Sequence, residues 1–172
     1  LECKKLKGIS KFGVGIDNID FDACKKLKIK VKYSKGVNKR SVSEEVLSLM
    51  ISLIRNLFVS GNNLKNFKWI VNGGTELSGK TIGIIGVGNV GKDLIKLLKP
   101  FKCKILVNDI LNQKKYYDKN KLIKATKKNI FMKSDIITIH TPLSNKTYKM
   151  VNYERLKLMK KTSFLINTSR GK

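Results

Sequence analysis

Gly86, Gly88 and Gly91 have the type and spacing that let a polypeptide backbone hold a phosphate group. They come directly after an apolar run at residues 81–87, which is typical of a strand buried on both faces. In such a strand–turn–helix unit the first glycine makes the tight turn, the second lets the backbone approach a pyrophosphate, and the third lets the helix pack on the strand. The amides at the start of the helix then face the anion. The spacing predicts a dinucleotide site, although the motif alone leaves open a glycine-rich turn without a ligand.

An acidic residue further along the chain supports the dinucleotide interpretation. Asp109 lies near the end of a second predicted strand at residues 104–110, close to the spacing of about 20 residues at which a carboxylate accepts the ribose hydroxyls. A carboxylate also repels a 2′-phosphate, so Asp109 favours NAD over NADP. Lys114 and Lys115 follow soon after and oppose this preference.

The elements that position these residues alternate between strand and helix. Apolar spacing predicts strands at 6–12, 29–33, 81–87, 104–110, 135–141 and 163–169, and helices at 21–27, 41–58, 90–98 and 153–160, whereas 114–133 is lysine-rich and only suggests a helix. The alternation predicts an α/β fold, a Rossmann-type parallel sheet with helices on both faces. Ligands of such sheets bind beyond the carboxyl ends of the strands. We therefore expect one cleft on the glycine-turn side, bordered by Asp109, Thr141, Pro142, Ser169 and Arg170.

The predicted helix at residues 41–58 has a clear start and an unusually wide apolar stripe. Ser41 and Glu44 have the spacing of a capping box, in which each side chain bonds to the other residue's backbone amide. The stripe is too wide for a single contact face. Core packing and a subunit interface both explain it, and the sequence does not choose between them.

The composition limits the kinds of partner. The net charge is +25 at pH 7, and a basic stripe would favour nucleic acid. Here lysines are spread along the whole chain and few of the basic residues are arginines, which indicates a lysine-biased composition and makes nucleic acid an unlikely partner. No apolar run approaches the ~20 residues of a membrane span, and no signal peptide is visible. Cys3, Cys24 and Cys103 are scattered, which predicts reduced thiols in the cytoplasm and neither disulfides nor a metal site.

Several blocks of sequence resemble the family of D-isomer-specific 2-hydroxyacid dehydrogenases. The chain has the family's blocks in the family's order, namely Phe12-Gly-Val-Gly-Ile-Asp-Asn-Ile-Asp20, the helix after Ser41, Glu76-Leu-Ser-Gly-Lys-Thr-Ile-Gly-Ile-Ile-Gly86, Ser134-Asp135, His140-Thr-Pro-Leu143 and Leu165-Ile-Asn-Thr-Ser-Arg-Gly171. The resemblance implies hydride transfer between NAD and C2 of a D-2-hydroxy acid. Blocks 74–77 and 140–143 favour 3-phosphoglycerate as the substrate, in serine biosynthesis. The alternatives are glyoxylate or hydroxypyruvate reduction, D-lactate oxidation, and a non-catalytic module that senses NAD.

The resemblance also implies a role for individual residues. Arg170 would be catalytic, because it would bind the substrate carboxylate and polarise the 2-oxo group, as a guanidinium that forks onto two oxygens can. Backbone amides of Val14 and Gly15 would bind the same carboxylate. The cofactor would be bound by the residues of the glycine turn and of the neighbouring strand ends, namely Val14, Gly86, Gly88, Asn89, Val90, Gly91, Asp109, Thr141, Pro142, Thr168 and Ser169.

His140 is the only histidine, and the reaction needs a proton donor. In the resembling family the acid/base histidine and its glutamate partner follow the Arg-Gly block, so we expect His140 to be structural or near the cofactor and the pair to lie after Lys172. We accordingly expect a fragment truncated at both ends and inactive by itself. Residues 1–38 would belong to a smaller flavodoxin-like substrate domain, and 39–172 to an NAD-binding Rossmann domain incomplete at its C-terminus. The family also implies a homodimer formed through the helix at 41–58.

Overall fold

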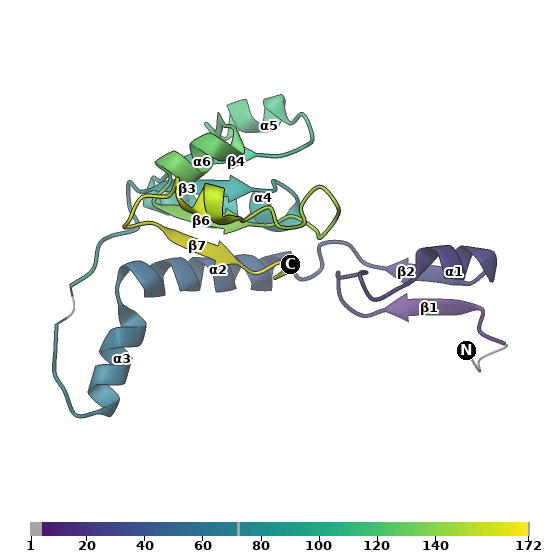
Figure 1. The fold of residues 1–172 in the computed structure, drawn as a ribbon, viewed down its shortest axis with the longest axis horizontal. Helices are drawn as coiled ribbons and strands as arrows, with labels where there is room; N and C mark the ends of the chain where they lie inside the picture. Colours follow the sequence, from purple (N-terminus) through teal and green to yellow (C-terminus); the bar gives the residue numbers. More distant parts are fainter. Residues whose placement is uncertain (1–4, 72, 172) are drawn as a thin grey trace.

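The computed structural model describes residues 5–71 and 73–171, which form two parts of unequal size (Figure 1). The smaller part contains β1 (Gly8–Lys11), α1 (Phe21–Lys26) and β2 (Lys30–Tyr33), and its two strands pair in parallel. Asp20 is the N-cap of α1, because its side chain accepts a hydrogen bond of 2.8 Å from the amide of Ala23. A connector leads from β2 to the long helix α2 (Lys39–Ile54) of the larger part.

The larger part is built on a five-stranded sheet. Its strands are β3 (Thr81–Ile85), β4 (Lys104–Asn108), β5 (Ile123–Lys124), β6 (Ile136–Ile139) and β7 (Phe164–Asn167). The spatial order is β5-β4-β3-β6-β7, and every neighbouring pair is parallel. The strand that precedes the glycine turn therefore lies in the middle, where the strand order reverses. The predicted Rossmann-type sheet is confirmed.

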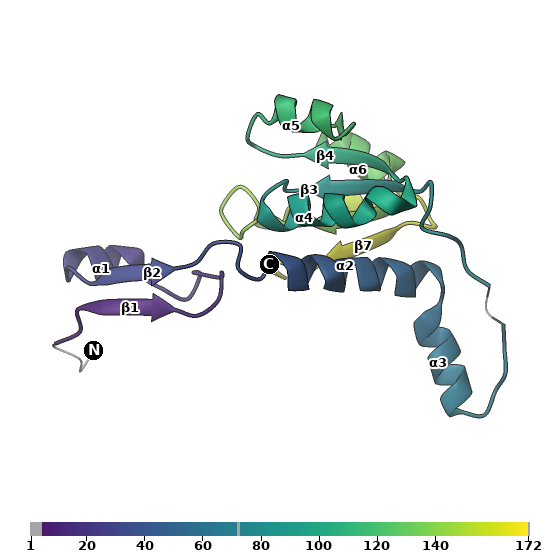
Figure 2. The same ribbon diagram turned by 180° about the vertical axis from the view of Figure 1, so that it is seen from behind.

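Helices cover both faces of this sheet, which explains why its central strands are continuous apolar runs. Ile82 and Ile84 of β3 face a core made with α2 and with α4 (Asn89–Leu98), while Ile85 faces a second core made with α6 (Lys127–Lys133). Figure 2 shows α4 in front of the sheet, and α2 packs against α4 and β7. Each such buried side chain contributes about 1.5–3 kcal/mol relative to an exposed one. The glycine turn thus projects from the central strand, which is buried at all of its positions but the first.

The predicted helix at 41–58 is wrong at both ends. α2 begins two residues earlier, with Asn38 as its N-cap, and the hydroxyl of Ser41 donates to the Asn38 carbonyl at 2.9 Å. Ser41 therefore lies inside the helix and forms no capping box. At the other end, Asn56 has a left-handed backbone with φ of 53°, and this residue separates α2 from α3 (Leu57–Lys65).

Smaller differences concern the polar segments. α3 extends to Lys65, beyond residue 58 where the predicted helix ended, and the region 114–133 contains α5 (Lys114–Lys119), β5 and α6. α7 (Tyr153–Leu156) is shorter than predicted, and Pro100 lies in a 3₁₀ turn (Lys99–Phe101) that ends α4. Of the cysteines, Cys24 and Cys103 are free, and Cys3 lies outside the described residues. Within the described ranges, none of the helices has the length and apolar character that a bilayer crossing requires.

Candidate functional site

The three glycines of the motif occupy the turn between β3 and α4, and two of them have no room for a side chain. Gly86 has a φ of 98°, and a Cβ there would lie 2.6 Å from the carbonyl oxygen of His140. A Cβ on Gly91 would collide with the carbonyl oxygen of Gly86. Gly88 instead faces open space, with no atom within 4 Å of an added Cβ. Gly86 and Gly91 therefore shape the turn, and Gly88 leaves its outer side accessible.

The start of α4 is free to receive an anion. Gly88 is the N-cap and carries no side chain that could bond to the first amides of the helix. The first four amides of a helix have no partner within it, and their dipoles favour negative charge. Gly88 and Asn89 are exposed and Val90 is half-buried, so the structure places the predicted pyrophosphate residues at an accessible helix end.

Asp109 lies just after β4 and bonds to the glycine turn. Its Oδ2 accepts a hydrogen bond of 2.6 Å from the amide of Val87, and its Oδ1 accepts one of 2.8 Å from the amide of Leu111. An ionised carboxylate has about four acceptor positions, so ribose hydroxyls can still bind it. Lys114 and Lys115, at the start of α5, are exposed.

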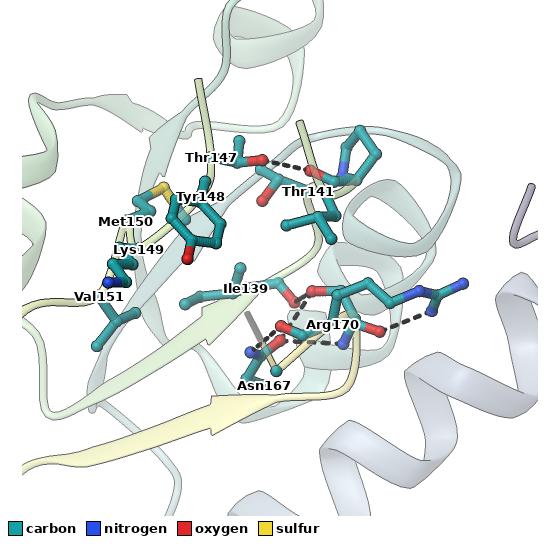
Figure 3. Close-up of a pocket in the computed structure, with 13 residues that line it drawn as sticks. Ile139, Thr141, Thr147, Tyr148, Lys149, Met150, Val151, Asn167 and Arg170 are labelled. Atoms are coloured by element: carbon teal, nitrogen blue, oxygen red, sulfur yellow. Dashed lines mark hydrogen bonds between the residues drawn. The ribbon is translucent and has the colours of Figure 1, made fainter. Parts of the chain in front are cut away.

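The ends of β6 and β7 border a cleft of about 500 Å³ (Figure 3). Four of the five predicted residues line it, namely Thr141, Pro142, Ser169 and Arg170. Asp109 does not, because β4 lies on the other side of β3 from β6 and β7. Tyr148 and Met150, in the loop after β6, complete the wall and were not predicted.

The segment after β7 is held by short-range hydrogen bonds. The amide of Ser169 donates to Oδ1 of Asn167 at 3.0 Å, and the side-chain amide of Asn167 donates to the Arg170 carbonyl at 2.8 Å. Among the described residues, the buried hydroxyl of Thr168 has no hydrogen-bond partner. An orphaned buried hydroxyl costs about 1–3 kcal/mol, which a bound ligand could recover.

The side chain of Arg170 reaches across to the smaller part of the protein. Its Nη2 and Nε lie 2.7 and 3.1 Å from Oδ1 of Asp17, and its Nη1 donates to the Ser169 carbonyl at 2.8 Å. The guanidinium lies so close to Gly15 that any Cβ there would collide with it. Hydrogen bonding to Arg170 lowers the pKa of the Asp17 carboxyl, and the same bond raises the pKa of Arg170. The structure thus brings together Gly15 and Arg170, two of the three predicted substrate residues, beside half-buried Val14.

The parallel sheet, the glycine turn and Arg170 have the arrangement that the sequence blocks implied, and a family model decides the assignment. The model described as "D-isomer specific 2-hydroxyacid dehydrogenase, NAD binding domain" matches residues 47–172. The chain belongs to this family.

Known relatives and solved structures agree with this assignment. The chain is 36% identical to a glyoxylate reductase of Thermofilum pendens. The match covers 96% of the chain and 51% of that reductase. The chain is 34% identical to a D-3-phosphoglycerate dehydrogenase of Methanocaldococcus jannaschii, over 99% of the chain and 33% of that protein. A crystal structure of an Aquifex aeolicus D-lactate dehydrogenase with NAD and lactic acid superposes with a TM-score of 0.88 at 30% identity, over 97% of the chain and 51% of the other. The chain therefore spans between a third and about half of the length of these relatives.

In this member of the 2-hydroxyacid dehydrogenase family, His140 is a poor candidate for the proton donor. Its Nε2 lies 3.0 Å from the hydroxyl of Thr138, which is fully buried. Burial lowers the pKa of His140 to about 4, so at pH 7 the imidazole is neutral and lacks the second, acidic ring proton that a general acid donates. The side chain is also not part of the cleft wall, which Thr141 and Pro142 form. This placement supports the packing role that we expected.

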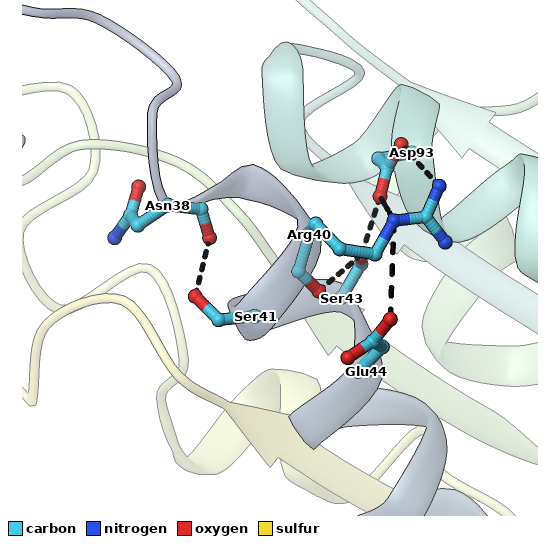
Figure 4. Close-up of polar contacts among 6 residues, drawn as sticks. All are labelled: Asn38, Arg40, Ser41, Ser43, Glu44 and Asp93. Carbon is cyan, nitrogen blue, oxygen red and sulfur yellow. Dashed lines mark hydrogen bonds and ion pairs between the residues drawn. The ribbon is translucent and has the colours of Figure 1, made fainter.

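A buried network that we did not predict fixes α4 (Figure 4). Asp93, on α4, accepts a hydrogen bond of 2.7 Å from the hydroxyl of Ser43 and pairs with Nε of Arg40 at 3.1 Å. Ser43 and Asp93 are buried, whereas the outer partner of Arg40, Glu44, is exposed and 3.9 Å away. Arg40 and Ser43 belong to α2, so the network joins the first helix of the larger part to the helix of the glycine turn. The only signal in the sequence was Asp93 itself, a charged residue within an apolar stripe.

Proposed function

We propose that the whole protein is an NAD-dependent oxidoreductase that acts on C2 of a D-2-hydroxy acid. The observation that carries the proposal is the position of Arg170, at the end of β7 and against the backbone of Gly15. A guanidinium in this place can bind the carboxylate and the 2-oxo group of a small acid side by side. The glycine turn lies at the same carboxyl edge of the sheet, so a dinucleotide and a 2-oxo acid can meet there.

The described residues fit the dinucleotide. Gly88 leaves the open side of the turn free for a pyrophosphate, the start of α4 supplies amides, and Asp109 can accept ribose hydroxyls. The unpartnered hydroxyl of Thr168, with Ser169, Thr141 and Pro142, suits the nicotinamide half. NAD, when bound, supplies or accepts the hydride. The chain's own contribution is to bind and orient the two reactants.

The charge of Arg170 stabilises the oxygen of the 2-oxo group as negative charge develops on it, while the amides of Val14 and Gly15 bind the carboxylate. We place the proton donor in a segment outside these 172 residues, because the neutral His140 cannot fill the role. The 172 residues alone should then bind NAD and be inactive.

Among substrates we propose 3-phosphoglycerate, and the supporting observation is the match of 99% of the chain to a D-3-phosphoglycerate dehydrogenase. Glyoxylate and hydroxypyruvate are the alternatives, since a glyoxylate reductase is 36% identical. Turnover of these acids and of D-lactate by the full-length protein, followed by NADH absorbance, distinguishes them. Tight NADH binding without turnover of any of them would indicate the sensing module.

The test of the reaction class is Arg170→Lys in the full-length protein. An ammonium keeps the charge but cannot form two parallel hydrogen bonds, so kcat/KM should fall. Losing one such donor typically costs on the order of 10²–10³ in rate. Circular dichroism should show an unchanged fold, and NADH affinity should be close to wild type. A folded variant with full turnover would contradict the role of Arg170.

We also propose a homodimer, through the end of the helix predicted at 41–58 and the segment that follows it. The apolar stripe of α2 is largely used within the chain, since Val46, Met50 and Ile54 are buried in its own core. The exposed apolar residues instead lie on α3 and in the loop after it, namely Leu57, Phe58, Val59, Leu64, Phe67, Trp69, Ile70 and Val71. A patch of this size is unusual on a monomer and suggests that a second copy covers it. The free thiols of Cys24 and Cys103 suit the reducing cytoplasm, where we place the protein.

A further inference from the structure

We propose that Asp17 is a positioning residue for the reaction, which holds the Arg170 guanidinium in the orientation that binds substrate. This inference rests on the proposed function, because it presumes that Arg170 binds the 2-hydroxy or 2-oxo acid. Asp17 belongs to the same sequence block as Val14 and Gly15. The family resemblance implied a binding role for those two residues but none for Asp17. Its assignment comes from the geometry of the ion pair.

The hydrogen bonds of Arg170 leave one edge of the guanidinium free. A guanidinium has five N–H groups. The single Oδ1 of Asp17 accepts from both Nε and Nη2, which uses the side edge of the group. Nη1 donates to the carbonyl of Ser169, the preceding residue, so this bond uses the hydrogen that faces the arginine's own backbone. One N–H on Nη1 and one on Nη2 are left, and together they form the terminal edge.

That terminal edge matches the proposed substrate. Two parallel N–H groups bind two oxygens in a plane, and a 2-oxo acid offers a carboxylate oxygen and its carbonyl oxygen in this way. Asp17 and Ser169 therefore hold the guanidinium from two sides and direct the free edge outward. Gly15 fixes the remaining side, because the guanidinium lies directly against it. Without Asp17, a long arginine side chain that is about half exposed would sample other rotamers.

The ion pair also makes the alignment depend on both parts of the protein. Asp17 lies in the loop after β1 of the smaller part, and Arg170 follows β7 of the larger part, 153 residues later. The guanidinium is thus oriented only when the two parts are packed as they are here. This arrangement places the oriented arginine at the junction where Val14 and Gly15 present their amides.

A competing interpretation is that Asp17 blocks Arg170 and must be displaced by the substrate. The two ideas predict opposite effects of removing the carboxylate. A blocking Asp17 predicts that Asp17→Ala lowers KM for the substrate. A positioning Asp17 predicts that the same substitution lowers kcat and raises KM, because the arginine is less often in the productive orientation.

The experiment compares Asp17→Ala, Asp17→Asn and the control Asp22→Ala in the full-length protein, with 3-phosphoglycerate, glyoxylate and hydroxypyruvate as substrates. Asp22 is an exposed acid in the same part of the protein, so its removal makes the same change in charge. We expect kcat/KM of Asp17→Ala to fall about tenfold or more, as for loss of a hydrogen bond to a charged group. Asp17→Asn should recover most of this loss, because one oxygen accepts both bonds and an amide oxygen can replace it. Asp22→Ala should stay within about twofold of wild type, the scale of a surface charge.

Two further measurements show whether Asp17 acts through Arg170. NADH affinity, from fluorescence titration, should be the same in all variants, since Asp17 bonds to Arg170 and not to the proposed pyrophosphate or ribose residues. Asp17→Ala should add less than about twofold to the loss in an Arg170→Lys background, because residues that act as one unit are not additive. A lowered KM in Asp17→Ala, an Asp17→Asn variant as impaired as Asp17→Ala, or additive losses would overturn the inference while Arg170 kept its role. If Arg170→Lys is itself fully active, it is the proposed function that fails.

Discussion

The carboxylate of Asp109 accepts a hydrogen bond of 2.6 Å from the amide of Val87, within the glycine turn. The residue predicted to bind ribose therefore also holds the turn predicted to bind pyrophosphate. Both halves of the proposed adenosine diphosphate site share the Asp109 side chain, so a change at this position should alter cofactor affinity and cofactor selectivity together.

We expect the full-length protein to bind NADH more tightly than NADPH. A carboxylate at position 109 accepts hydroxyls and repels a 2′-phosphate, and Asp109→Ser should narrow the difference by removing the charge. Fluorescence titration with NADH and with NADPH measures the difference between the two affinities. Equal or tighter NADPH binding by the native protein would show that Lys114 and Lys115 outweigh Asp109, and Lys114→Ala is the variant that would then restore the preference.

Substitution of His140 should change pH-dependent stability and leave turnover largely intact. Burial lowers its pKa from 6.5 to about 4, so the unfolded chain binds a proton more readily than the native one. Stability is then fully present above pH 6.5 and is lost as the pH falls toward about 4. His140→Asn should have a urea midpoint that depends less on pH in this window than that of the native protein. A folded His140→Asn protein as inactive as Arg170→Lys would mean that His140 is the proton donor.

Removing Asp93 should destabilise the larger part of the protein. Asp93→Ala deletes hydrogen bonds to Ser43 and Arg40 at a buried position, and we expect a loss of about 1–3 kcal/mol in the free energy of unfolding. Glu44→Ala removes the exposed partner of the same arginine and should cost less than about 1 kcal/mol. Urea denaturation of the two variants measures both values. Equal effects would mean that the buried network contributes no more to stability than the exposed Arg40–Glu44 pair within α2.

The dimer proposal predicts that one charge on α3 separates the subunits. Phe58 is 64% exposed within the chain, and Phe58→Asp should yield a monomer at micromolar concentration by light scattering. Phe12, in the smaller part, is fully exposed and provides a matched control. Phe12→Asp should remain dimeric. A native protein that is already monomeric at this concentration would contradict the proposed homodimer.

The local patterns of the sequence determined the strands and the motif. Residues 81–91 read as a buried strand, a glycine turn and a helix start because each of these features depends on neighbours a few positions away. β3, β4, β6 and β7 followed from apolar runs, and Asp109 from its distance along the chain to the glycines. Pairing of strands by right-handed crossovers then placed Thr141, Pro142, Ser169 and Arg170 at one edge.

Tertiary packing decided what local patterns cannot express. At the start of α2, Arg40 and Ser43 bond to Asp93 of α4, a tertiary contact that the capping rule applied to Ser41 does not take into account, and the predicted boundary was wrong. The partners of Arg40 and Arg170 lie on elements remote in sequence, and any of the twelve acidic residues could have paired with them. Only the folded chain brings Asp93 close to Arg40 and Asp17 close to Arg170. An ion pair requires that the two charges be close in space, and it imposes no periodic pattern on the sequence.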